Sequence, residues 1–283
     1  MSPSDDAAAE NVEVWSGKSR TDENFPVGSR LIARKHRDPI HRFYTFARNA
    51  DDIADSPALS SEEKLARLGV MEDVLLGRRT TGSPSAAALR VSLARTGVTS
   101  KHATDLLVAF RQDSVKSRYA TIDELYHYCH YSAVPVGRYV LDLHGEHHEC
   151  HSPSDALCLS LQILNHMQDC AKDLVELDRC YLPRALLDHF GAGVDDLRLS
   201  AETPALRRVF ITLLDRIDRM NHAASELPEI VRDRRLRVEV GIILGLSKRL
   251  ARRLAHNDPI SHRVKLGKRD AVFSALASVF YLV

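Results

Sequence analysis

Helical spacing of apolar residues runs through most of this 283-residue chain. In one well-marked stretch, Ile40, Phe43, Ala47, Ala50 and Ala54 recur at intervals of three or four residues and form a single apolar stripe. No segment shows convincingly the alternation of apolar and polar residues that marks a half-buried strand. The pattern therefore predicts an all-α fold.

The chain length favours one large domain over two. Residues 1–20 are polar, with only Trp15 as an anchor, so we expect a disordered or loosely attached tail. We expect residues 21–283 to form the folded domain. Its first clear helix is predicted to begin with Asp38 as N-cap and Pro39 in the first helical position.

The same stretch carries two acidic residues four positions apart. At about 100° per residue, Tyr44, Arg48, Asp51 and Asp55 fall along one flank of the apolar stripe, and Asp52 points further out. Two carboxylates at the edge of a buried face are costly unless a cation lies between them. Alone, the pair also fits an ordinary solvated helix edge, so its interpretation depends on a partner elsewhere.

A second acidic pair occurs at Asp169 and Asp173, on a helical face shared with Gln162, Asn165 and Glu176. This face carries carboxylates and amides without Lys or Arg, whereas solvated faces usually mix both charges. Oxygen ligands without thiol or imidazole suit Mg²⁺, which keeps water molecules for substrate phosphates. Two such faces across a cavity are predicted to hold Mg²⁺ and a diphosphate. The alternative is an ordinary amphipathic surface helix.

Composition narrows the class of protein. Lys and Arg total 39 against 38 Asp and Glu, so no global field favours nucleic acid as a partner. The five cysteines are odd in number and no signal peptide precedes them, which indicates reduced thiols in a cytoplasmic protein. No apolar run approaches the ~20 residues that span a bilayer.

Two segments between the acidic pairs also carry patterns that predict local structure. Thr121 and Glu124 have the spacing of a capping box, and we expect them to open a long helix that Pro135 and Gly137 kink. Residues 144–151 are rich in histidine but lack a second half-motif at a ligand spacing. We interpret them as a solvent-exposed loop rather than a metal site.

From Asn24 onward the chain resembles the squalene and phytoene synthase family, which joins prenyl diphosphates head to head. The matching motifs are residues 48–55, 128–131, 135–137, 161–165 and 173–183. Within the family, residues 23–29, 165–169 and 258–264 most resemble the bacterial hopanoid-pathway branch. That branch converts presqualene diphosphate to hydroxysqualene.

The resemblance implies a single-domain helical bundle of the isoprenoid-synthase type, with both acidic motifs facing a central apolar cavity. It implies a Mg²⁺ cofactor with Asp51, Asp55, Asp169 and Asp173 as ligands. These four residues, Arg48 and Tyr128 form the expected catalytic set. The expected substrate-binding set is Phe43, Tyr44, Phe46, Arg48, Tyr131, Gln162 and Asn165. Many relatives carry arginine where this chain has Gln168, so we assign Gln168 no role.

The expected activity is hydration of presqualene diphosphate to hydroxysqualene, with release of diphosphate. Synthesis of presqualene diphosphate, squalene or phytoene is the alternative within the same enzyme class. A non-enzymatic assembly protein on this fold is a further alternative. No glycine-rich dinucleotide fingerprint follows a predicted strand, which disfavours synthesis that consumes NADPH.

The substrate's long hydrocarbon body raises the question of delivery. We expect handover from a neighbouring pathway enzyme or peripheral contact with the inner membrane face. Docking elements for that contact would be residues 273–283 and a basic face of Lys248, Arg249, Arg252 and Arg253. The alternatives are a terminal helix that closes the core and an ordinary solvated face.

Overall fold

The computed structural model describes residues 11–13, 31–267, 270, 274, 277 and 278. Within them the chain is helical and contains no strand, which confirms the all-α prediction. The elements are α1 (Arg34–Asp55), α2 (Ser61–Leu75), α3 (Pro84–Thr96), α4 (Lys101–Asp113), α5 (Ile122–Ser132), α6 (Val134–His144), η2 (His148–Cys150), α7 (His151–Leu177), α8 (Arg184–Phe190), η3 (Val194–Arg198), α9 (Pro204–Ala223), η4 (Ala224–Glu226), α10 (Leu227–Ile230) and α11 (Arg234–His256).

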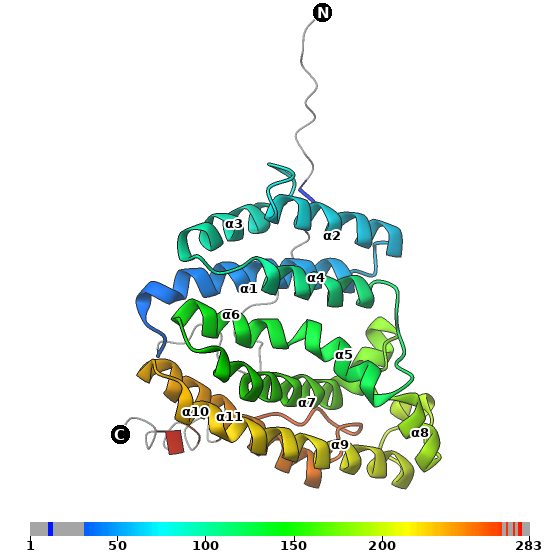
Figure 1. Cartoon of the computed structure of the whole chain (residues 1–283). Coiled ribbons are helices and arrows are strands. Elements are labelled where there is room, and N and C mark those ends of the chain that lie inside the picture. Colours follow the sequence, from blue (N-terminus) through cyan, green and yellow to red (C-terminus); the bar gives the residue numbers. More distant parts are fainter. Residues whose placement is uncertain (1–10, 14–30, 268–269, 271–273, 275–276, 279–283) are drawn as a thin grey trace, which may run out of the picture.

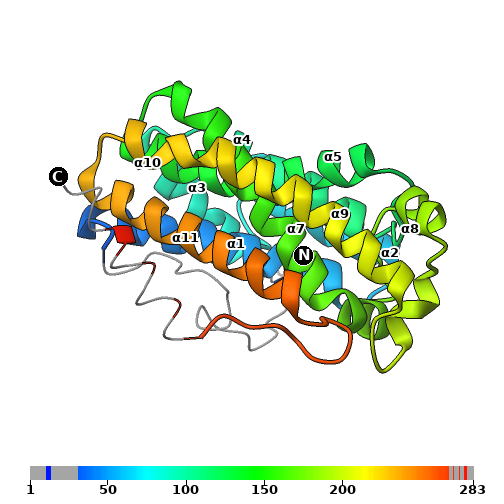
Figure 2. The ribbon, with the colours of Figure 1, turned by 90° about the horizontal axis from the view of Figure 1, so that it is seen from below.

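The helices are stacked in layers (Figure 1). α2 and α3 cover α1 and α4, which pack against α5 and α6, and α7 follows beneath them. Seen from below, α9 and α11 lie side by side, and the segment of residues 257–267 runs along the side of α11 that faces away from α9 (Figure 2). The 27-residue α7, about 40 Å long, therefore lies between the two halves of the stack.

Two apolar clusters hold these layers together. One joins α1, α2, α3 and α4 and includes the fully buried Phe46 and Leu89. The other surrounds α7, α9 and α11 and includes the fully buried Ile163 and Phe210. Because α1 belongs to the first cluster and α7 from Ile163 to Leu174 belongs to the second, each acidic motif is anchored by its own core.

The start of α1 differs from the prediction. The helix begins at Arg34, so Pro39 lies inside it rather than at its first position. Proline at this place forgoes one backbone hydrogen bond near the helix start. Asp38 is not a cap: its carboxylate pairs with Arg42 at 3.0 Å and with Arg95 of α3 at 2.9 Å. The acid therefore ties α1 to α3.

Asp52 also departs from the prediction. Its side chain was expected to point away from the apolar stripe, yet it is buried. The reason is that α1 is packed on several sides, by α2, α3 and α4. A helical wheel assumes one buried face and one solvated face, but little of the surface of α1 is solvated.

The predicted long helix after Thr121 is two helices. Thr121 caps α5 by accepting a hydrogen bond from the Glu124 amide at 3.2 Å, as its spacing indicated. The chain then breaks at Ala133 instead of kinking, and α6 begins at Val134. Pro135 lies in the first turn of α6, where its missing N–H costs nothing.

Gly137 sets the approach of α6 to α7. A Cβ atom at this position would lie 2.5 Å from the Ser154 hydroxyl oxygen and 2.7 Å from the Cys158 sulfur. Both contacts are too short for any side chain. Glycine here lets the two helices pack closely.

The segment 144–151 is not the exposed loop that we expected. It comprises the end of α6, the turn η2 and the first residue of α7. Cys150 is buried in the first apolar cluster, which draws the segment onto the bundle. His144 and His151 are half-buried, whereas His147 and His148 are exposed.

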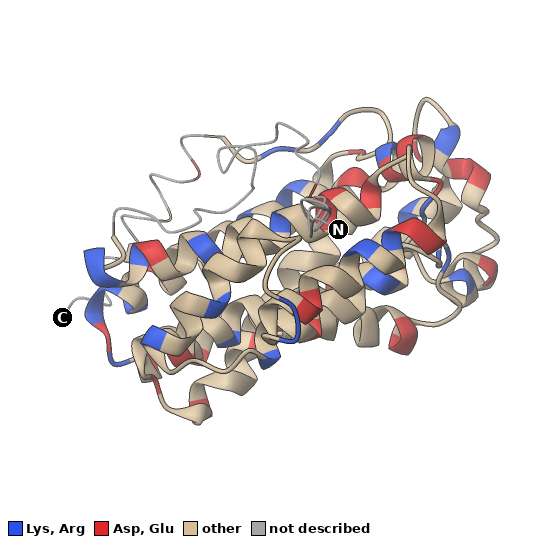
Figure 3. Cartoon of the chain, turned by 90° about the horizontal axis from the view of Figure 1, so that it is seen from above, with Lys and Arg blue, Asp and Glu red and all other residues tan. Residues whose placement is uncertain are grey.

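Charge is mixed over the molecule. Basic and acidic residues both occur on the helices across the view from above (Figure 3). No helix among the described residues is both long and apolar enough to cross a membrane. Most of residues 1–20 and 273–283 lie outside the described residues, so the domain boundaries stay a prediction.

Candidate active site

The first acidic motif lies on the last turns of α1. An Nη of Arg48 donates to Asp51 Oδ2 at 2.9 Å, and its other Nη donates to the Tyr44 hydroxyl at 3.3 Å. The three side chains therefore share one face, as the spacing predicted. All three are half-buried, so the group reaches solvent without leaving the helix packing.

The second acidic motif lies in the last third of α7. Asp169 and Asp173 are half-buried, and so are Gln162 and Asn165 on the same face. Arg263, from the segment of residues 257–267, places its guanidinium on Asp169, with Nε 2.5 Å from Oδ1 and an Nη 2.8 Å from Oδ2. Only the Nη contact to Oδ2 is a hydrogen bond, since the buried Oδ1 accepts none from the described residues although Nε lies close to it. A segment distant in sequence thus supplies the positive charge for this motif.

Arg179 connects the two motifs. Asp178 ends α7 in the left-handed conformation, with φ of 51°, and so turns the chain inward. The buried Arg179 guanidinium then donates to Asp55 Oδ1 at 2.6 Å and to the carbonyl oxygens of Ala54 and Asp113 at 3.2 and 3.1 Å. The end of α1 is thereby tied to the end of α7.

A buried carboxylate and two tyrosines lie next to this arginine. The Tyr128 hydroxyl donates to Asp113 Oδ2 at 2.7 Å, and the Tyr181 hydroxyl donates to Asp113 Oδ1 at 3.1 Å. Burial raises the pKa of Asp113 to about 6, although Arg179 and both hydroxyls oppose the rise. Burial likewise holds the pKa of Tyr128 well above its ordinary value. Tyr128 is therefore a protonated, fixed side chain.

His166 completes this aromatic group. Its ring stacks on Tyr181 at a centroid distance of 3.7 Å and lies 5.8 Å from the Tyr128 ring. Burial, and then the charge of Arg179, lower the pKa of His166 to about 3. The imidazole is therefore neutral at physiological pH and adds no positive charge beside the acids.

Asp173 differs from the other three motif acids. Burial raises its pKa to about 7, and the carboxylates of Asp169 and Asp55 add to the rise. The two motifs are therefore within electrostatic reach of each other. Asp173 has no ion-pair partner in the part of the chain that the structure describes. A divalent cation between the motifs would supply the missing charge, and carboxylate oxygens are the ligands that Mg²⁺ prefers.

Comparison with known proteins places the chain in a family. The squalene/phytoene synthase family model matches residues 18–270. The chain belongs to this family. It is 46% identical to the hydroxysqualene synthase of Rhodopseudomonas palustris, over 94% of this chain and 91% of the relative. It is 40% identical to the hydroxysqualene synthase of Sinorhizobium fredii, over 91% of this chain and 88% of the relative.

A solved family structure has the same fold. The squalene synthase of Alicyclobacillus acidocaldarius superposes with a TM-score of 0.73 at 32% identity, over 84% of this chain and 91% of that chain. The predicted isoprenoid-synthase bundle is therefore confirmed. Because the family consists of synthases that process prenyl diphosphates, the chain is an enzyme.

The predicted aromatic residues are dispersed over the bundle. Phe43 stacks on Tyr139 at 4.0 Å, and Phe46 is fully buried in the first apolar cluster. Tyr131 is half-buried, at a ring distance of 5.1 Å from His127. A hollow of about 670 Å³ lies elsewhere, lined by Arg138, Asp155 and Arg219 among others. Substrate contact by the aromatic residues and the central apolar cavity stay predictions.

Four members of the site were missed by sequence reasoning: Asp113, His166, Arg179 and Arg263. Arg179 lies within the motif of residues 173–183, so its place in the family pattern could have indicated it. Asp113 carries no such signal, since it is the last residue of an ordinary helix. Each of these residues gains its partners through contacts between distant parts of the chain.

Proposed function

We propose that this enzyme converts presqualene diphosphate and water to hydroxysqualene and diphosphate. The observation that carries the proposal is the high identity, over nearly the whole chain, to relatives that bear the name hydroxysqualene synthase. The four motif acids and their arginines support it, because they suit a substrate that leaves a diphosphate behind.

Asp51, Asp55, Asp169 and Asp173 would hold Mg²⁺ in this proposal. When bound, the ion supplies positive charge opposite the oxygens of the departing diphosphate. The fit rests on the donor set and on Asp173, which has no ion-pair partner among the described residues and whose pKa is raised to about 7 by burial and then by the carboxylates of Asp169 and Asp55. Arg179 would act as a positioning residue, since it fixes Asp55 without reaching solvent.

Arg48 and Arg263 would bind the diphosphate. Each guanidinium now lies on a motif acid, and the Arg263 side chain is the more exposed of the two, at 36% against 15% for Arg48. The position where many relatives carry arginine has a different use here, because the Gln168 amide donates to the Val264 carbonyl. Gln168 thus anchors the segment that brings Arg263 to the site.

Tyr128, Tyr181 and the neutral His166 would face the reacting carbons. Their stacked rings are buried, and aromatic faces stabilise positive charge better when water is excluded. Tyr44, Phe43, Phe46, Tyr131, Gln162 and Asn165 would contribute to binding the remainder of the substrate.

The proposed reaction is balanced without an electron donor. The carbon–oxygen bond to diphosphate breaks, and its electron pair leaves with diphosphate. The carbocation opens its cyclopropane ring, water adds through oxygen, and one water proton is released. No reductant is consumed, in keeping with the expectation that NADPH is not required.

Squalene synthesis is the second candidate, since the solved relative from Alicyclobacillus acidocaldarius bears the name squalene synthase. The two functions are separated by incubating the purified protein with presqualene diphosphate and Mg²⁺, with and without NADPH. We expect a C30 alcohol in both samples. Squalene that forms only with NADPH would overturn the proposal. Asp169→Asn is the control, and it should abolish product formation.

We also propose that the substrate arrives by peripheral contact with the inner membrane face. The support is the predicted basic face, although it is smaller than the sequence suggested. Lys248 is half-buried and donates to Ser225 at 2.9 Å, and Arg253 pairs with Asp270 at 2.7 Å, whereas both Arg252 and Arg253 are exposed. Co-sedimentation with anionic vesicles should weaken in high salt and with Arg252→Glu. Salt-insensitive failure to bind would contradict the proposal.

A further inference from the structure

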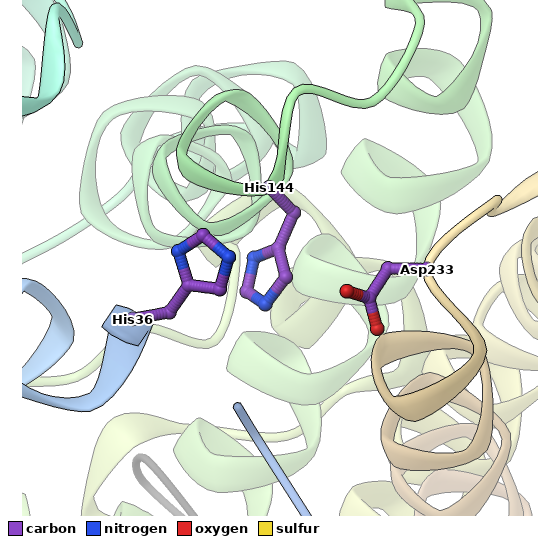
Figure 4. A group of neighbouring side chains, drawn as sticks. All are labelled: His36, His144 and Asp233. Atoms are coloured by element: carbon purple, nitrogen blue, oxygen red, sulfur yellow. The ribbon is translucent and has the colours of Figure 1, made fainter. Parts of the chain in front are cut away.

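Three side chains from distant parts of the chain meet at the far end of α1. His36 lies in the first turn of α1, His144 ends α6, and Asp233 caps the start of α11. Their ligand atoms lie within 4.8 Å of one another, and Figure 4 shows the two rings facing each other with the carboxylate on the His144 side. Two imidazoles and one carboxylate are a common donor set for divalent transition metals.

The hydrogen bonds of His144 select the tautomer that a metal ligand needs. Its Nδ1 lies 2.7 Å from the Val140 carbonyl oxygen. Because a carbonyl only accepts, Nδ1 must carry the hydrogen, which leaves the lone pair on Nε2. This Nε2 is buried and has no hydrogen-bond partner in the structure. A metal-bound histidine typically has this arrangement, with the second nitrogen donating to a carbonyl.

Asp233 is held in place by other groups. Its Oδ1 accepts from the backbone amides of Arg235 and Leu236 at 2.8 and 3.0 Å. The amide of Asp233 itself donates to Glu146, two residues after His144, at 2.8 Å. The loop that carries one ligand therefore fixes the position of another, and Oδ2 accepts no hydrogen bond from the described residues.

His36 brings the second imidazole. Its side chain is buried and its ring lies 4.1 Å from the His144 ring, tilted by 36°. The packing of these two rings brings both imidazoles within reach of one ion.

We propose that His36, His144 and Asp233 bind a divalent transition metal ion, represented by Zn²⁺. Neighbouring donors in a tetrahedral Zn²⁺ site with bonds of about 2.1 Å are roughly 3.4 Å apart. The present separations of at most 4.8 Å therefore close with small side-chain movements. Water or a further ligand would complete the coordination.

This site is separate from the acidic motifs. His36 precedes Asp51 by fifteen residues of α1, which corresponds to about 22 Å along the helix. Its donors also differ, since imidazole nitrogen favours Zn²⁺ over Mg²⁺. The ion would join the beginning of α1, the end of α6 and the beginning of α11. Its effect is on stability rather than on the reacting carbons.

Binding can be measured without turnover. The full-length protein is stripped with a chelator, supplied with excess Mg²⁺ to occupy the acidic motifs, and titrated with Zn²⁺ by calorimetry. We expect one Zn²⁺ per chain and a higher melting temperature. Asp233→Asn keeps an N-cap oxygen but removes the charged ligand, and it should weaken binding at least about tenfold. His36→Asn should do the same.

His151→Asn is the matched control. His151 belongs to the same segment and contacts Asp142 at 3.1 Å, away from the three proposed ligands. It should bind Zn²⁺ as the wild type does. The proposal is overturned if the wild type takes up no Zn²⁺ at one per chain. It is equally overturned if Asp233→Asn and His36→Asn both bind as tightly as His151→Asn, since exposed histidines would then account for the uptake.

Discussion

The two acidic motifs have the same spacing but different surroundings. On α1, Asp51 is paired with Arg48 of its own helix, and Asp55 is paired with the buried Arg179. On α7, Asp169 is paired with Arg263 from a distant segment, and Asp173 has no such partner among the described residues. The first motif is thus neutralised by the fold itself. The second remains short of positive charge.

The arginines that pair with the two motifs differ in burial and in what they connect. Arg179 is buried and makes four hydrogen bonds that join α1, α4 and the end of α7. Arg263 is more exposed and reaches only the surface of α7. We infer that the pair of Arg179 with Asp55 holds the helices in place, whereas the pair of Arg263 with Asp169 can rearrange when a cation or diphosphate binds.

Arg179→Ala should have the largest effect. It leaves Asp55 and Asp113 without their buried partner, and breaking one side of a buried pair costs about 3–5 kcal/mol. Urea unfolding should show this loss. Arg184→Ala is the control, because its pair with Asp188 is exposed and should be worth less than about 1 kcal/mol. Equal losses in the two variants would mean that Arg179 does not connect the motifs.

Asp173→Asn should stabilise the protein without Mg²⁺ while abolishing turnover. The native Asp173 carboxyl, with its pKa raised to about 7, holds a proton more tightly than the unfolded chain does. The wild type therefore loses stability as pH rises from about 4 to about 7. Thermal melting should show the gain from Asp173→Asn in full above pH 7, shrinking as pH falls toward 4.

Glu176→Gln is the matched control for that variant. Glu176 lies one turn later on α7 and pairs with Lys172 in solvent at 3.6 Å. Its substitution should leave the melting temperature nearly unchanged at every pH. A pH-independent effect of Asp173→Asn would contradict the proposed shortage of positive charge.

Arg263→Gln should change stability least. Its pair with Asp169 is partly solvated, so the loss should be at most about 1 kcal/mol. Diphosphate binding should weaken instead, which inhibition of turnover by added diphosphate would measure. Lys265→Gln, an exposed position in the same segment, should leave inhibition unchanged. Unaltered inhibition in Arg263→Gln would remove this arginine from the diphosphate site.

The contrast between the motifs could be predicted only in part. Periodicity placed Tyr44, Arg48 and Asp51 on one face of a helix, because these relations depend on local geometry alone. It misplaced Asp52, since burial depends on how many neighbours surround a helix. Arg179 and Arg263 reach the motifs through a left-handed turn and a long return of the chain. Helical spacing carries no information about either.

The break between α5 and α6 shows the same limit. Pro135 and Gly137 were correctly placed near a disturbance of the helix, but the pattern did not distinguish a kink from an interruption. The structure places the interruption at Ala133, and Gly137 then approaches Ser154 where α6 packs against α7. Helical spacing carries no information about that contact between helices.

In the proposed reaction, the motif acids promote loss of diphosphate and water captures the resulting carbocation. The most direct test is turnover of presqualene diphosphate with Mg²⁺ in water enriched in oxygen-18, without reductant, followed by mass spectrometry of the product. We predict a C30 alcohol that carries the heavy isotope, since a water oxygen replaces the diphosphate oxygen on carbon. An alcohol that retains the unlabelled ester oxygen would place cleavage at phosphorus and contradict this account.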